Sequence, residues 1–232
     1  MLSYSREVVN ESIHLSETAL VISYCLFAHF VFEQSGYCIR VYDSPSVMVE
    51  HSKAFDLDTH ESGSFVFCYN SNLQFNSNSV ERIFSYCAGT FICAVITPST
   101  VTDSEFLLGV GDYSLIYYDD FKTNTLVNNN FTDAKLKYGI CFDMYAMSAE
   151  HSFFGNITTF VVFNCKANQK KPLVKDCIVL KIESDTIHGY IVHSAHATLI
   201  ENDYFGQIGK FQFEQEDLIT FKDCYVDDPE YH

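Results

Sequence analysis

Short apolar stretches alternate with polar corners along the whole chain. A four-residue pattern (apolar, polar, small polar, then Cys, Ser, Asn or Asp) occurs nine times. Its copies begin at Ile22, Val49, Phe75, Val101, Val127, Ala149, Val174, Ile200 and Phe221. Successive copies start 21 to 27 residues apart, most often 26. Such a period indicates stacked units that each bury one face against their neighbours.

A second apolar signal keeps step with the first. Ten residues before several copies stand Ile39, Phe65, Phe91, Tyr117, Tyr190 and Phe211. No stretch keeps an apolar spacing of 3.6 residues, so we expect short strands and no long helix. The pattern therefore predicts an all-β, single-domain, right-handed parallel β-helix of about nine coils, with about 25 residues per coil. A leucine-rich-type solenoid is the alternative, but its Leu spacing and helical half are missing.

Parallel coils in register place equivalent residues in columns about 4.8 Å apart. The third pattern position is rich in Asn and Asp, which tolerate a left-handed backbone, so we expect a corner there. At the fourth position we expect small groups that face inward and hydrogen-bond along the stack. At the second position Glu150, Lys175, Glu201 and Lys222 alternate in charge, as exposed neighbours on adjacent strands prefer.

The two ends of the chain differ from the repeats. Residues 1–17 are expected to form a cap or partial coil, and residues 18–232 the β-helix. The acidic C-terminal segment contains Pro229. We expect it to end the sheets and to discourage end-to-end stacking.

The coil length and the Asn, Ser and Cys ladder at the corner resemble those of the pectin-lyase-like parallel β-helix proteins. The resemblance spans roughly Thr18 to Asp227. It extends to the uncharacterised Cys-, Asn- and aromatic-rich β-helix families of some protists. It implies an architecture and not one activity, because this fold hosts lyases, hydrolases, adhesins and inert scaffolds.

The amino-acid composition limits the classes of partner that we expect. The net charge is −16, with 30 acidic residues against 14 Lys and Arg, so we expect neither nucleic acid nor anionic lipid as a partner. The longest apolar run, residues 19–32, is too short to span a bilayer, which needs about 20 apolar residues. We expect no membrane insertion. The N-terminus has no basic start followed by an apolar core, so we expect a cytoplasmic location by default.

Acidic side chains decide whether we expect an enzyme, because β-helix enzymes that cleave polysaccharides place acidic residues on neighbouring coils. Asp103, Asp119 and Asp120 are the candidate catalytic residues here. The NTD, GHG and RIK motifs of the polygalacturonases are absent, and no Arg follows Arg82 to serve as a lyase base. A carbohydrate-active hydrolase or lyase is therefore the alternative function.

A non-catalytic scaffold or binding module is the function we favour. Tyr residues that point outward can stack on sugars or pack on a protein, so carbohydrate or another protein is the expected partner. The candidate binding residues are Tyr37, Tyr42, Tyr69, Tyr117 and Tyr118. The nine Cys form no CxxC pair and predict buried free thiols. We expect no metal and no cofactor.

Overall fold

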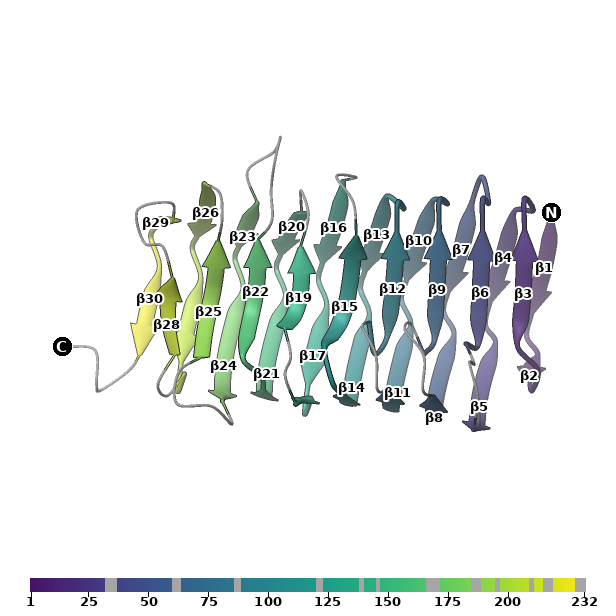
Figure 1. Cartoon of the computed structure of the whole chain (residues 1–232), viewed down its shortest axis with the longest axis horizontal. Coiled ribbons are helices and arrows are strands. Elements are labelled where there is room, and N and C mark those ends of the chain that lie inside the picture. The colour runs from purple at the N-terminus through teal and green to yellow at the C-terminus, as the bar shows by residue number, and fades with distance from the viewer. Residues whose placement is uncertain are drawn as a thin grey trace.

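The computed structural model describes residues 1–31, 37–59, 64–85, 89–119, 123–137, 140–144, 147–165, 172–184, 189–194, 197–208, 211–214 and 219–227. These residues form a parallel β-solenoid, as the sequence pattern predicts, and they contain no helix. Each coil contributes strands to three sheets, here called A, B and C (Figure 1). Accordingly, no helix in the described part of the chain is long and apolar enough to cross a membrane.

Sheet A contains ten described strands: β1 (Leu2–Ser5), β4 (Leu20–Ser23), β7 (Val47–Glu50), β10 (Leu73–Asn76), β13 (Ser99–Thr102), β16 (Asn124–Val127), β20 (Met147–Glu150), β23 (Leu173–Lys175), β26 (Thr198–Glu201) and β29 (Ile219–Lys222). Sheet B contains eleven: β2 (Val8–Val9), β5 (Leu26–Val31), β8 (Lys53–Thr59), β11 (Ser79–Ser85), β14 (Glu105–Gly111), β17 (Asn130–Thr132), β18 (Lys135–Leu136), β21 (Phe153–Thr158), β24 (Ile178–Glu183), β27 (Tyr204–Gly206) and β30 (Tyr225–Asp227). Sheet C contains nine: β3 (Ile13–Ser16), β6 (Ile39–Tyr42), β9 (Val66–Tyr69), β12 (Ile92–Val95), β15 (Ser114–Asp119), β19 (Ile140–Met144), β22 (Val161–Cys165), β25 (Gly189–Ser194) and β28 (Phe211–Glu214).

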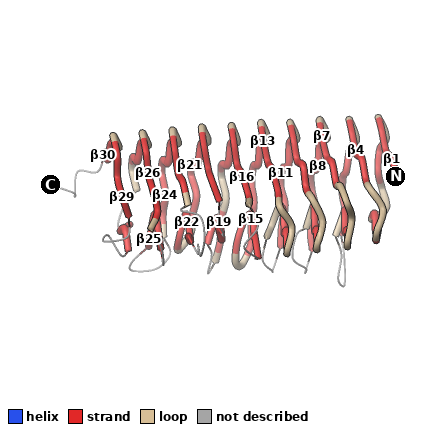
Figure 2. The backbone as a smooth tube through the Cα atoms, turned by 90° about the horizontal axis from the view of Figure 1, so that it is seen from above, coloured by secondary structure: helices blue, strands red, loops and turns tan. Residues whose placement is uncertain are grey.

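The chain winds through sheets A, B and C in that order and then returns to A. In Figure 1 the near strands of sheet C run upward and those of sheets A and B descend behind, while the chain advances from right to left. This winding is right-handed. Seen from above, the coils lie side by side along one axis (Figure 2). Residues 1–17 contribute β1, β2 and β3, which pair with β4, β5 and β6. Sheet A therefore holds ten strands where we predicted about nine coils.

The interior is a set of apolar columns. In sheet B, equivalent positions carry Phe27, Ala54, Val80, Phe106, Phe131, Phe154, Val179 and Phe205, all buried. The Phe106 and Phe131 rings stack with centroids 4.5 Å apart, and Phe131 and Phe154 follow at 5.4 Å. Across the interior, Phe142 of sheet C meets Phe131 edge-on at 4.8 Å. These rings form the middle of the core.

The corner between sheets A and B has the two features that the pattern predicts. The third pattern position has a left-handed backbone in eight of the nine copies, for example at His51 (φ 48°) and Asp103 (φ 51°), and in the remaining copy the left-handed residue lies one position earlier, at Asn128. The fourth position forms a buried ladder of side chain to backbone hydrogen bonds. In one stretch, the Ser52 N–H donates to Asn78 Oδ1 (2.9 Å), and the Asn78 N–H donates to Ser104 Oγ (3.1 Å). The ladder satisfies backbone groups that a tight buried turn otherwise leaves unpaired.

One coil departs from the predicted frame by a residue. The pattern copy placed at Val127 begins at Leu126, because Val101 pairs with Leu126 and Thr102 with Val127. Phe131 therefore points into the core at the position equivalent to Phe106, whereas a frame that begins at Val127 would put Thr132 there. Residues 128–130 are all Asn, so the sequence pattern could not distinguish which of them occupies the left-handed corner position. In the frame that begins at Val127, the Phe131 ring would point to solvent. Burial of this ring therefore favours the observed register of β17.

Candidate functional site

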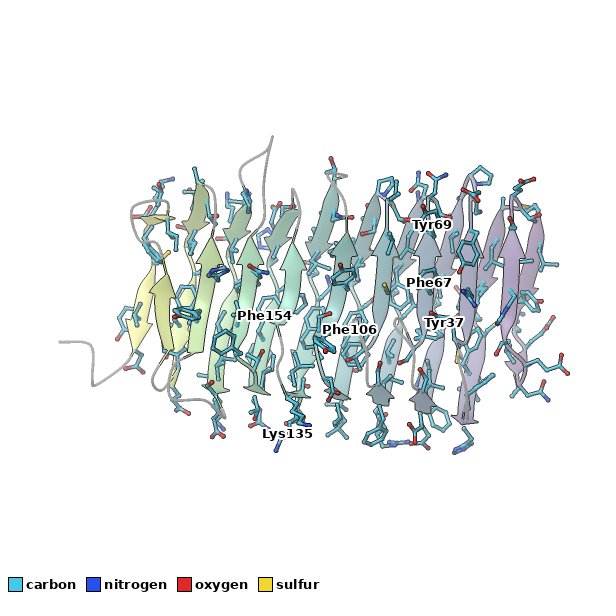
Figure 3. All side chains as sticks on the ribbon, viewed as in Figure 1. Tyr37, Phe67, Tyr69, Phe106, Lys135 and Phe154 are labelled. Atoms are coloured by element: carbon cyan, nitrogen blue, oxygen red, sulfur yellow. The ribbon has the colours of Figure 1, made fainter. Side chains whose placement is uncertain are left out.

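An aromatic platform lies on the outer face of sheet C, near the N-terminal end of the solenoid. Strand alternation builds it: Ile39 and Val41 of β6 point inward, so Arg40 and Tyr42 point outward. In β9 the outward residues are Phe67 and Tyr69. The two strands pair in register, with Arg40 opposite Phe67 and Tyr42 opposite Tyr69. Tyr37, just before β6, completes the platform (Figure 3).

The platform rings are in mutual contact. Tyr42 lies 5.7 Å from Phe67 and 5.9 Å from Tyr69, measured between ring centroids. Tyr37 lies 4.9 Å from Phe67. Tyr37 is only 5% exposed and packs against Phe67, whereas Tyr69 is 36% exposed and presents its ring to solvent. In Figure 3, Tyr37, Phe67 and Tyr69 follow one another along the strand direction on the near face.

Arg40 is the charged member of the platform. Its guanidinium carbon lies 4.9 Å from the Tyr37 ring centroid, 5.1 Å from that of Tyr42 and 5.8 Å from that of Phe67. Its Nε also donates a hydrogen bond to the Tyr42 hydroxyl (2.7 Å). These contacts hold the guanidinium in one place by cation–π attraction and one directional bond. No carboxylate among the described residues forms an ion pair with Arg40.

A hollow of about 300 Å³ adjoins the platform. It is lined by His14, Leu15 and Ser16 of β3 and by Arg40 and Tyr42 of β6. His14 is exposed and stands opposite Arg40 in the register. The hollow therefore combines an aromatic wall with hydrogen-bond donors, which is the composition of a site for a polar ligand that has flat apolar faces.

The five candidate Tyr residues fall into three settings. Tyr37, Tyr42 and Tyr69 come together in the platform. Tyr117 is half-buried on sheet C, opposite Cys93 of the neighbouring coil. Tyr118 points into the core and is fully buried, which raises the pKa of its hydroxyl. Sequence reasoning missed Arg40 and Phe67, although the alternation in "CIRVY" and "FVFCY" places both on the same face as their neighbouring Tyr residues.

The candidate carboxylates lie on different elements. Asp103 follows β13 at the corner between sheets A and B, where its Oδ1 accepts a hydrogen bond from Asn128 Nδ2 (3.0 Å). Asp119 is the last residue of β15 in sheet C. Asp120 lies outside the described residues, and the Asp119 side chain does as well. The assignment of catalytic roles to these three residues stays a prediction.

Asp103 belongs to a shallow polar groove of about 370 Å³ along that corner. His51, Lys53, Asp103 and Glu105 supply its charged and titratable side chains, and Ser and Asn residues supply the remainder. The groove is wide open, and its residues come from the left-handed corner column and the start of each sheet B strand. Nowhere in the described chain do three His, Cys, Asp or Glu side chains gather closely enough to hold a metal ion.

Six cysteines among the described residues form no disulfide, and five of these six are buried. Burial raises the pKa of Cys38 well above its ordinary value and the pKa of Cys177 to about 12. These two thiols are therefore neutral at physiological pH and act as small apolar side chains. Cys177 and Cys224 share a column of the corner ladder, but Asp203 of the intervening coil lies between them.

Comparison with known proteins adds no relative: no family model matches this chain, and no curated protein or solved structure is significantly similar to it.

Proposed function

We propose that this protein is a non-catalytic β-solenoid binding module whose aromatic platform binds carbohydrate. The observation that carries the proposal is the platform itself: Tyr42, Phe67 and Tyr69 form a contiguous outward aromatic surface on a flat parallel sheet. Sugar rings have flat faces of C–H groups that pack on aromatic rings, and their hydroxyls pair with the donors of the adjoining hollow.

The setting of the platform supports this role. The platform lies on paired strands and not on a loop, so its rings are held in place before a ligand arrives. Its coil spacing of about 4.8 Å is close to the length of one sugar ring, which lets successive rings of a chain lie along neighbouring coils. The resemblance to pectin-lyase-like β-helices also supports the proposal, because that architecture presents a long face on which a ligand can lie.

The test is a panel of neutral and acidic polysaccharides, measured by affinity electrophoresis and calorimetry. We expect binding by the unmodified chain and a loss of roughly tenfold or more on Tyr69→Ala or Tyr42→Ala, because central aromatic anchors carry more than about 1 kcal/mol each. Tyr113→Ala is the matched control: Tyr113 is 56% exposed, lies between β14 and β15, and is outside the platform. Equal binding by all four proteins would place the ligand elsewhere.

The alternative is a hydrolase or lyase that uses the corner groove, because Asp103 and Glu105 both line it. The same panel decides this point when new reducing ends are assayed. Cleavage that Asp103→Asn abolishes would support an enzyme at this groove. Cleavage that only Asp120→Asn abolishes would support an enzyme that does not use Asp103. Binding without cleavage would support the module, and neither binding nor cleavage would leave a protein partner as the candidate.

A further inference from the structure

The two end coils of the solenoid carry open strand edges. In the part of the chain that the structure describes, β1, β2 and β3 each pair with a strand on one side only, and so do β28, β29 and β30 at the other end. Every coil pairs in parallel with the next, so the edge of the last coil offers the backbone groups that the edge of the first coil accepts.

The side chains at the two ends match when the columns are continued by one coil. The in-register partners would be Leu2 with Ile219, Tyr4 with Phe221, Val8 with Tyr225, and Val9 with Val226. All eight residues have apolar or aromatic side chains. Two of these side chains are largely exposed to solvent: Val8 is 70% exposed and Tyr225 is 59% exposed. Tyr225 already stacks on Tyr204 of the preceding coil, with centroids 5.5 Å apart, and Val8 would extend that column.

The corner column makes the match specific. Arg6 occupies the left-handed corner position of the first coil, and Asp223 occupies it in the last. Continuing the column places Arg6 of one copy directly against Asp223 of another. Within one chain, corner residues one coil apart already meet in this way: His151 Nδ1 lies 3.6 Å from Asp176 Oδ2. Opposite charges at this separation favour pairing, and like charges would oppose it.

We propose that copies of this chain associate head to tail, with β29 and β30 of one copy pairing with β1 and β2 of the next. The two surfaces differ, so the contact is heterologous, and a translation along the solenoid axis does not close. The product is an open series of copies and not a dimer. We also expected the acidic C-terminal segment, residues 227–232, to oppose stacking. All of this segment except Asp227 lies outside the described residues, and the same experiment tests both ideas.

The experiment is sedimentation velocity with light scattering on the 232-residue chain across a wide range of protein concentrations. We expect the average mass to rise with concentration without stopping at a dimer. Arg6→Glu and Asp223→Lys should each reduce association at least tenfold, because each places like charges together. The double variant Arg6→Asp/Asp223→Arg should restore it. Adding Arg6→Glu protein to the unmodified chain should shorten the assemblies, because only one of its ends can pair.

Asp103→Lys is the matched control. It makes the same charge change as Asp223→Lys, at the same type of left-handed corner, but in the middle of the solenoid. It should leave association unchanged. Circular dichroism on each variant verifies that the fold is retained. A monomer at every concentration, a mass that stops at the dimer, or association that Arg6→Glu and Asp223→Lys both leave intact would overturn the proposal.

Discussion

Asp203 occupies a corner position that Ser, Asn or Cys fills in the other coils. Its Oδ1 accepts the backbone N–H of Cys177 (2.6 Å), but its Oδ2 is buried and has no hydrogen-bond partner among the described residues. Burial is the main cause that raises the pKa of this carboxyl from 3.8 to about 7. A ladder that works with neutral side chains therefore holds one group that ionises near neutral pH.

The protonation of Asp203 makes stability depend on pH. The folded state keeps the proton over a range where the unfolded chain has released it, so the folded state is favoured at low pH. Stability from this group falls as pH rises from about 4 to about 7 and is lost above that range. At about 1.36 kcal/mol per pH unit the loss is at most about 4 kcal/mol, and solvent screening of this partly accessible carboxyl lowers it to about 2–4 kcal/mol. We expect Asp203→Asn to be more stable than the unmodified chain by about that amount at pH 8.

Urea unfolding at pH 5 and pH 8 measures this difference. The amide should also find an acceptor, because Asn78 Nδ2 and Asn129 Nδ2 donate to the backbone carbonyls of Val49 and Val101 at equivalent positions. An Asp203→Asn variant whose advantage is the same at both pH values would contradict the argument.

Among the described residues with a left-handed backbone, Ile96 alone has a β-branched side chain. It has φ 52° at the corner between sheets C and A, where Asp43 and Asn70 hold the equivalent left-handed positions. A β-branched side chain is strained in that conformation. Asn70 Nδ2 donates to Asp43 Oδ1 (2.7 Å), so an amide suits this column. We expect Ile96→Asn to stabilise the fold by about 1 kcal/mol in thermal or urea unfolding, whereas Ile96→Val should give no gain.

At the scale of elements, the stacked rings of sheet B are the main packing unit. Phe131 contacts rings of two neighbouring coils and of sheet C. We expect Phe131→Ala to lower the free energy of unfolding by about 3–5 kcal/mol, because it leaves a cavity between rigid neighbours. Thr132→Ala, on the outer face of the same strand, should change it by less than about 1 kcal/mol. Equal effects would contradict the register that places Phe131 inside.

Much of the architecture could be predicted from the sequence, because a corner recurs at nearly even distances and each feature of it has a local cause. Left-handed positions rich in Asn and Asp, and inward small polar groups, both followed from the pattern. The frame near residue 127 could not, because a run of Asn looks alike in either register. The platform was predicted only in part. Its Tyr residues were candidates from the sequence, but the position of Arg40 among three aromatic rings from two coils is visible only in the structure.

At the scale of the molecule, each coil pairs only with the coils before and after it. Stability is then close to a sum over coils and their interfaces, so whole coils can be removed. Residues 73–98 make one coil, because Leu73 pairs with Ser99. We expect their deletion to leave a folded solenoid with native-like circular dichroism and a cooperative transition.

The same nearest-neighbour arrangement decides how the protein responds to force. When the two ends are pulled apart, tension acts first on an end coil, which must release three parallel strand pairs before the next coil carries the load. Each release frees about 26 residues, or roughly 90 Å of extended chain. The solenoid should therefore lengthen in regular steps under an optical trap and rewind from whichever coils remain. Such a molecule can absorb repeated strain without losing its whole fold at once.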